Sequence, residues 1–249
     1  MTKIKLANIF FSIILPLGCL PRLSAQSDAM GNMPNMENTG NAQIEHNAGG
    51  AHQADMGPHM KMTALRMERP GDRARAQQIV EIARKVCDKY KDYKTALADG
   101  FHIFLPNVPQ KQYHFNNPQY AYEATQHFNP EHPTSLLYEK DGDGYKLVGV
   151  MYTAPRWASE DELNQRIPLS IAQWHAHINL CLPPANKMQA VGVRAPEFGF
   201  HGSISTEANC RAVGGRFITQ AFGWMVHVYP FAPTQSDVWS VERQMQHND

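Results

Sequence analysis

Two histidines separated by one residue, His175 and His177, have the spacing in this chain that most directly suggests chemistry. They lie in the stretch from Gln173 to Cys181, where dense apolar residues followed by two prolines predict a β-strand. Side chains alternate between the faces of a strand, so both imidazoles should point the same way. Such a pair often begins a metal site, although hydrogen-bonded polar residues on a half-exposed face would show the same spacing.

Two more histidines lie in segments that also predict strands. His114 stands between two aromatic residues, and His227 lies in the middle of the apolar run 223–231. Imidazoles converging from two or three strands would form an open site suited to copper, zinc or iron, with a position left for water or substrate. Glu139, on a predicted hairpin strand, is a candidate carboxylate ligand or general base, and equally a solvated strand residue.

Residues 26–67 predict a disordered tail, because they contain little aliphatic bulk and show no period of a helix or strand. Their unusual feature is sulfur and imidazole at close spacing. The candidate metal-binding residues of the tail are Met30, Met33, Met36, His59, Met60 and Met62. Thioethers are soft ligands that select Cu(I), so this composition favours a loose copper-collecting tail over a flexible linker with incidental methionines.

Residues 1–25 have the pattern of a secretory signal peptide: two lysines, an apolar run from Leu6 to Leu20, and small residues before Ala25. The run is too short for a comfortable membrane span, so none is expected after cleavage. A lipid anchor at Cys19 is the second interpretation. The expected location is therefore the periplasm or the exterior of the cell.

Cleavage after Ala25 would remove three of the chain's 23 basic residues and none of its 23 acidic ones, which leaves a net charge of −3. Without a basic stripe, nucleic acid is not an expected partner. Three cysteines remain in an oxidising compartment. Cys87 lies in the apolar stripe of a predicted helix, so we expect Cys181 and Cys210 to form a disulfide, which would also remove Cys181 as a metal ligand.

Residues 68–249 predict a single α+β domain. A long N-terminal helix should begin at Asp72 and end before Gly100, and its apolar stripe indicates a break near Asp88. A mainly antiparallel sheet of about five to seven strands with short helices should follow. Its clearest part is a hairpin over 135–152, turned by the Asp-Gly-Asp-Gly sequence at 141–144.

Several segments of this domain resemble an uncharacterised family of exported bacterial proteins. The segments are Tyr113-His114-Phe115 with Asn117, Asn129-Pro130-Glu131-His132-Pro133 leading to Leu137-Tyr138-Glu139, Leu147-Val148-Gly149-Val150 and Met225-Val226-His227-Val228. The likeness covers residues 70–240 and excludes the tail. It implies a folded unit that carries His114 and His227, and it implies no activity, cofactor or substrate.

The first functional hypothesis is an exported copper-binding protein that handles the metal or uses it in redox chemistry. Its predicted ligands are His175, His177, His227 and His114. A zinc-dependent hydrolase-like enzyme with the same histidines is the second hypothesis, and a metal-free small-ligand-binding domain is the third. The sequence leaves open the substrate, the oligomeric state, the role of Cys87 and whether the protein is an enzyme.

Overall fold

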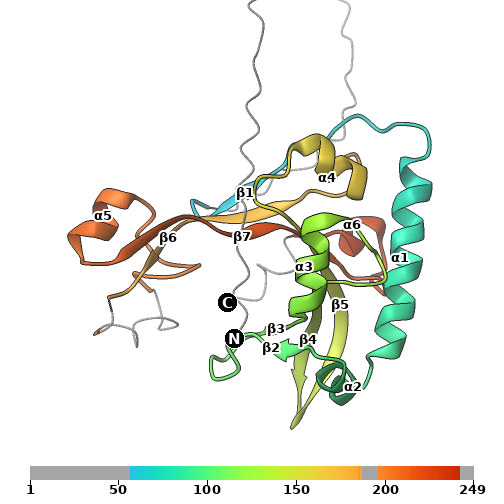
Figure 1. The fold of residues 1–249 in the computed structure, drawn as a ribbon, viewed down its shortest axis with the longest axis horizontal. Helices are drawn as coiled ribbons and strands as arrows, with labels where there is room; N and C mark the ends of the chain where they lie inside the picture. Colours follow the sequence, from blue (N-terminus) through green and yellow to red (C-terminus); the bar gives the residue numbers. More distant parts are fainter. Residues whose placement is uncertain (1–56, 185, 187–195, 242–249) are drawn as a thin grey trace, which may run out of the picture. The chain divides into compact units, whose positions relative to one another are not determined.

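The computed structural model describes residues 57–184, 186 and 196–241. In these ranges a seven-stranded sheet has the order β1-β6-β7-β5-β4-β3-β2 (Figure 1). The strands are β1 (Met60–Met62), β2 (His102–Ile103), β3 (Gln112–Asn116), β4 (Ser135–Asp141), β5 (Gly144–Ala154), β6 (His175–Leu182) and β7 (Arg216–Val228). The helices are α1 (Asp72–Lys89), α2 (Tyr93–Ala98), α3 (Pro118–Gln126), α4 (Glu160–Arg166), α5 (Glu207–Ala212) and α6 (Gln235–Val238). None of the helices in the described ranges is long and apolar enough to cross a membrane.

The predicted α+β fold with a mainly antiparallel sheet is confirmed, since all neighbouring strands pair antiparallel. The long N-terminal helix ahead of the sheet is not supported, because β1 precedes α1 and residues 1–56 lie outside the described part. The helix α1 also ends at Lys89. Asp92 starts a separate helix, since its side chain accepts a hydrogen bond from the Lys94 N–H at 3.0 Å.

The two faces of the sheet have different surroundings. Helix α1 lies beside the sheet near β5 (Figure 1). On this face, which we call the helix face, Leu136 and Val150 belong to a large core that also contains the buried stripe of α1. That stripe consists of Ala76, Ile79, Val80, Ala83, Val86 and Cys87. Side chains alternate along a strand, so Leu137 and Met151 point to the opposite face, where they form a separate small cluster. The candidate ligands lie on this opposite face.

The predicted hairpin is confirmed. β4 and β5 pair from Ser135↔Met151 to Asp141↔Gly144, so the turn lies where the Asp-Gly-Asp-Gly sequence placed it. Gly142 adopts a φ of 53°, a left-handed backbone conformation that glycine tolerates without steric cost. This hairpin places Leu137 and Met151 in the middle of the sheet.

The predicted tail extends too far toward the C-terminus, because its residues Met60–Met62 form strand β1 of the sheet. Met60 pairs with His177 and Met62 with His175. The attachment continues on both sides of β1, since the Thr63 N–H donates to the Trp174 carbonyl at 2.9 Å and the Ile178 N–H donates to the His59 carbonyl at 2.9 Å. Backbone pairing with a buried neighbour strand supplies the stabilisation that the sparse apolar content of this segment lacks. Residues 26–56 of the predicted tail, including Met30, Met33 and Met36, and the predicted signal peptide lie outside the described residues.

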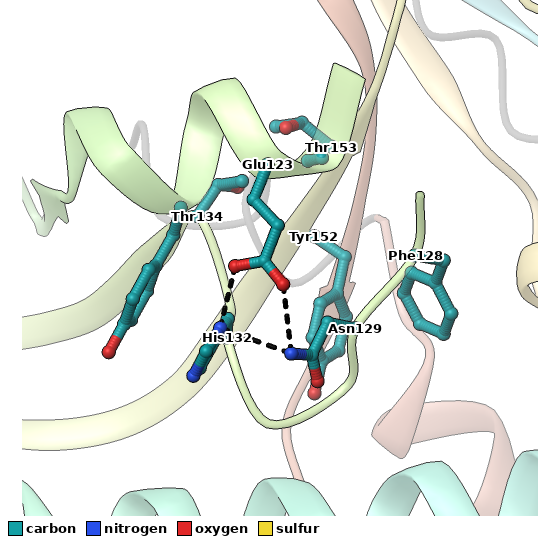
Figure 2. Close-up of a pocket in the computed structure, with 9 residues that line it drawn as sticks. Glu123, Phe128, Asn129, His132, Thr134, Tyr152 and Thr153 are labelled. Atoms are coloured by element: carbon teal, nitrogen blue, oxygen red, sulfur yellow. Dashed lines mark hydrogen bonds and ion pairs between the residues drawn. The ribbon is translucent and has the colours of Figure 1, made fainter. Parts of the chain in front are cut away.

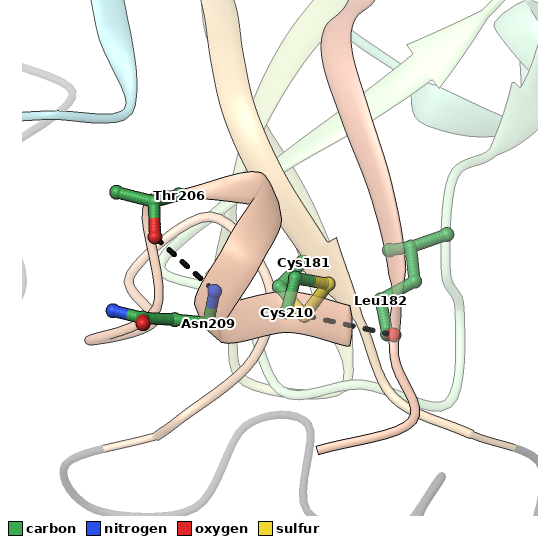
Figure 3. The surroundings of a disulfide bond; sticks show 5 residues. All are labelled: Cys181, Leu182, Thr206, Asn209 and Cys210. Carbon is green, nitrogen blue, oxygen red and sulfur yellow. Dashed lines mark hydrogen bonds between the residues drawn. A yellow bond between two sulfur atoms is a disulfide. The ribbon is translucent and has the colours of Figure 1, made fainter. Parts of the chain in front are cut away.

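The C-terminal end of β6 and the N-terminal end of β7 extend away from the other helices and carry α5 (Figure 1). The predicted disulfide between Cys181 and Cys210 is present there and joins β6 to α5 (Figure 3). It is packed in a small cluster with Phe198, separate from the main core. A Cβ on Gly215 would lie 2.6 Å from the Cys181 Sγ, so a glycine is needed beside the bridge. The disulfide is compatible with an oxidising compartment.

Replacing Cys181 and Cys210 together by serine should lower the free energy of unfolding by about 3–4 kcal/mol, because the bridge closes a loop of 29 residues in the unfolded chain. Urea denaturation of the oxidised wild type and the double variant measures this difference. Cys87→Ser is not a suitable control, since Cys87 is buried in α1. The matched comparison is the wild type with its disulfide intact and the wild type after treatment with reductant. Equal urea midpoints of these two samples would contradict the prediction.

Candidate metal centre

The four predicted histidine ligands come from three different parts of the sheet and share its second face. His175 pairs with Met225 of β7, and His227 lies two residues beyond Met225, so both rings point to the same side. His177 follows two residues after His175 on β6. His114 of β3 pairs with Leu137, which belongs to the cluster on this side. We call His114, His175, His177 and His227 the histidine cluster.

The rings of the histidine cluster are close neighbours. The ring centres of His175 and His227 are 5.1 Å apart, those of His114 and His227 are 5.6 Å apart, and those of His175 and His177 are 5.9 Å apart. Two imidazoles bound to one tetrahedral ion have ring centres about 5 Å apart, because each nitrogen lies about 2.0–2.1 Å from the metal. The spacing of these rings therefore suits a shared ion.

The two central rings are deeply buried and lack hydrogen-bond partners. His175 is 0% exposed and His227 is 1% exposed. Neither Nδ1 nor Nε2 of either ring has a partner among the described residues. A buried polar atom without a partner costs about 1–3 kcal/mol. Stability alone therefore does not account for two such rings side by side in the interior.

Burial also determines the charge of the histidine cluster. It lowers the pKa of His175 to about 3 and those of His114 and His177 to about 4, and it holds the pKa of His227 well below its usual value. The neighbouring imidazoles add repulsion, since the charge of any one of them disfavours protonation of the others. All four rings are therefore neutral at pH 7, the protonation state in which imidazole binds metals.

Among the described residues, no group of three or more His, Cys, Asp or Glu side chains is placed so that it could hold a metal ion. Loading a metal would require the rings to turn about their side-chain torsions. Turning His175 or His227 would break no hydrogen bond to the described residues. What the arrangement provides is a set of neutral, closely spaced donors.

Residues predicted to lie in the tail are next to the histidine cluster. Met60 faces His177 and Met62 faces His175, so these thioethers and imidazoles share one side of the sheet. His59 is buried, and its Nε2 lies 2.6 Å from the Gly202 carbonyl oxygen, to which it donates. Its Nδ1 is buried and has no partner among the described residues. Of the predicted tail ligands, Met60 and Met62 therefore share a face of the sheet with His177 and His175.

Aromatic side chains border the histidine cluster on the side of His177. The ring of Phe200 lies 4.8 Å from that of His177 and stacks on Phe222, which contacts Phe104. Phe222 has a φ of 62°, a left-handed conformation unusual for a bulky residue. The next residue is Gly223, where a Cβ would collide with the Ala154 carbonyl. This irregularity in β7 breaks the regular register with β6 between His175 and His177.

Glu139 and Cys181 are not members of the histidine cluster. Glu139 lies two residues beyond Leu137 on β4, paired with Gln112 and Lys146, and no group of three ligands includes it. Cys181 is in the disulfide, as predicted. Met225 shares the strand face of His227, as the alternation Met225-Val226-His227 predicts, and it pairs with His175. Sequence reasoning missed Met151, which pairs with His227, because its position depends on long-range strand pairing.

A second polar cluster lies at the C-terminal end of α3 (Figure 2). His132 Nδ1 is 2.6 Å from Glu123 Oε2, and the Asn129 side chain donates to Glu123 Oε1 at 3.0 Å. Hydrogen bonds from Asn129 and His132 lower the pKa of Glu123. The ring of His132 stacks on Tyr120. The hollow beside them has a volume of about 10 Å³, enough for one water, so the cluster fixes the turn to α3 and has no room for a substrate.

Comparison of the chain with models of known protein families found no match, and comparisons with curated proteins and with solved structures found none either.

Proposed function

We propose that this chain is an exported metal-binding protein that holds one ion among His114, His175, His177 and His227. The observation that carries the proposal is the pair of buried imidazoles, His175 and His227, whose four ring nitrogens have no partner among the described residues. A metal ion would satisfy these nitrogens and offset the cost of burying them. The partly exposed His114 and His177 would complete the ligand set from the outer side.

Copper is the expected metal. Met60 and Met62 place thioethers on the same side of the sheet as His177 and His175. Thioethers favour copper in its reduced state and are poor ligands for zinc. Zinc at the same histidines, in a hydrolase-like enzyme, is the second candidate, and the four neutral imidazoles are the observation that supports it. A carboxylate to act as general base would have to come from outside the histidine cluster.

The disulfide and the signal-like residues 1–25 together favour export to the periplasm or beyond the cell. The roles compatible with this proposal are storing, carrying or using copper in redox chemistry. Among them, transfer of copper to or from a partner would exploit the partly exposed His177.

The test is metal-dependent thermal stability of the chain from residue 26 onward. A ligand that binds only the folded state adds about 4 kcal/mol of stability at a thousand times its dissociation constant. Metal bound only by residues that do not unfold together with the domain would leave the melting temperature unchanged. A rise in melting temperature therefore reports binding within the domain. We expect a clear rise with Cu(I), kept reduced by ascorbate, which leaves the disulfide intact.

His102→Ala is the matched control, because His102 is exposed on β2 and belongs to neither polar cluster. It should show the same rise as the wild type. If Cu(I), Cu(II) and Zn(II) all leave the melting temperature of the wild type unchanged, the proposal is wrong and a metal-free ligand-binding domain becomes the better account.

A further inference from the structure

Two buried methionines stand directly beside the two buried histidines. Met225 pairs with His175 across β6 and β7, and Met151 pairs with His227 across β5 and β7. Directly opposed residues of antiparallel strands have Cβ atoms about 4.5–5.5 Å apart on the same face. The long, unbranched methionine side chain can place its sulfur beside the neighbouring ring from that position.

These methionines are separate from the main core. Met225 is 5% exposed and Met151 is 7% exposed, and they form a small cluster with Leu137 and Tyr229 on the face that carries the histidines. The large core on the helix face does not include them. The immediate surroundings of His175 and His227 are therefore thioether, aliphatic and aromatic groups, together with the other two imidazoles.

All of the donors in this setting are neutral. The charges that act on the rings of His175 and His227 are those of other histidines, and no carboxylate of the described residues is among them. An ion bound here keeps its full charge in a buried place. The free energy of moving an ion out of water rises with the square of its charge, so a monovalent ion enters such a place at much lower cost than a divalent one.

We propose that Met225 and Met151 are thioether ligands that make the histidine cluster a selective site for a soft monovalent cation, Cu(I), over Zn(II) and Cu(II). This inference rests on the proposed metal-binding function and adds the identity of two ligands and the selectivity for Cu(I) over Zn(II) and Cu(II). Two neutral imidazoles and one or two thioethers form a soft donor set that matches Cu(I). The same set offers Zn(II) neither a thiolate nor a carboxylate.

The experiment measures the apparent Cu(I) and Zn(II) affinities of the chain from residue 26 onward by the ion-dependent rise in melting temperature. Met225→Leu and Met151→Leu keep the volume and apolar character of the side chain and remove the sulfur. Each variant should weaken Cu(I) binding at least tenfold while leaving Zn(II) binding within about twofold of the wild type. Met67→Leu is the matched control, because Met67 is 90% exposed, and it should change neither affinity.

The outcomes separate the two proposals. A wild type that responds to no metal rejects the metal-binding function itself. A wild type that responds to Cu(I), with both leucine variants responding equally well, leaves that function standing and overturns the ligand role of the methionines. An equal loss of Cu(I) and Zn(II) affinity in the variants also overturns it, because packing and not sulfur would then be responsible. X-ray absorption of the bound Cu(I) measures scattering from neighbouring sulfur atoms. Weaker sulfur scattering in Met225→Leu than in the wild type would support the ligand role directly.

Discussion

Replacing His227 by leucine should abolish metal binding by the folded domain without destabilising it. Leucine has a volume close to that of histidine and needs no hydrogen bond. The variant removes two buried nitrogens that lack partners among the described residues, each of which costs about 1–3 kcal/mol in the metal-free protein. We therefore expect the unfolding midpoint of metal-free His227→Leu to equal or exceed that of the wild type. The rise in melting temperature on adding Cu(I) should disappear, which corresponds to at least a 100-fold loss of affinity, or about 2.7 kcal/mol.

His175→Leu should behave in the same way, because its ring has the same burial and the same unpartnered nitrogens. His102→Ala, on the exposed side of β2, should leave both measurements unchanged. The test combines two measurements: the unfolding midpoint of the metal-free protein and the rise in melting temperature with Cu(I). A structural role for His227 predicts a large loss of stability in the metal-free protein, and that result, together with an unchanged response to metals, would contradict the prediction.

The metal-free protein should lose stability steeply between about pH 6.5 and pH 5, before most carboxylates titrate. Burial lowers the pKa of His175 to about 3 and that of His227 well below its usual value. Histidines in the unfolded chain keep a pKa of about 6.5, so below that pH the unfolded state binds protons that the folded state does not. The contribution of these neutral rings to the free energy of unfolding is fully present above pH 6.5. It is lost as the pH falls toward the pKa values of the rings in the folded protein.

Each ring that gains its proton only on unfolding costs about 1.4 kcal/mol per pH unit. His175 and His227 together should therefore lower the free energy of unfolding by about 3 kcal/mol between pH 6.5 and pH 5, and His114 and His177 should add to this. Urea denaturation across this range measures the slope. The double variant His175→Leu/His227→Leu should have a slope smaller by about two protons. Equal slopes in wild type and double variant would show that these rings do not titrate on unfolding.

Local patterns in the sequence predicted the parts of the fold that depend on neighbouring residues. The turn at 141–144, the strand containing His175 and the shared side of His175 and His177 all follow from periodicity and turn chemistry. The pairing of Cys181 with Cys210 followed from eliminating Cys87, whose apolar surroundings predicted a buried helix position. These predictions needed no knowledge of which strands are neighbours.

The parts that sequence reasoning missed depend on long-range pairing. Three residues are enough for β1 because β6 supplies its partners, and so short a strand has no detectable period. Met151 approaches His227 only because β5 and β7 are adjacent in the sheet, which no local pattern indicates.

The pairing of β1 with β6 has a consequence for how the protein folds. Met62 and His175 pair in the sheet, and the rings of His114 and His227 are neighbours across it. In each pair the two residues are separated by almost half of the chain's length. The chain loses entropy when such long loops close, and the stabilising contacts form only afterwards. Sheets of this topology therefore form slowly. The unfolded chain holds its imidazoles and thioethers far apart along the sequence. The complete donor set arises only at the end of folding, so metal loading should follow folding and not guide it.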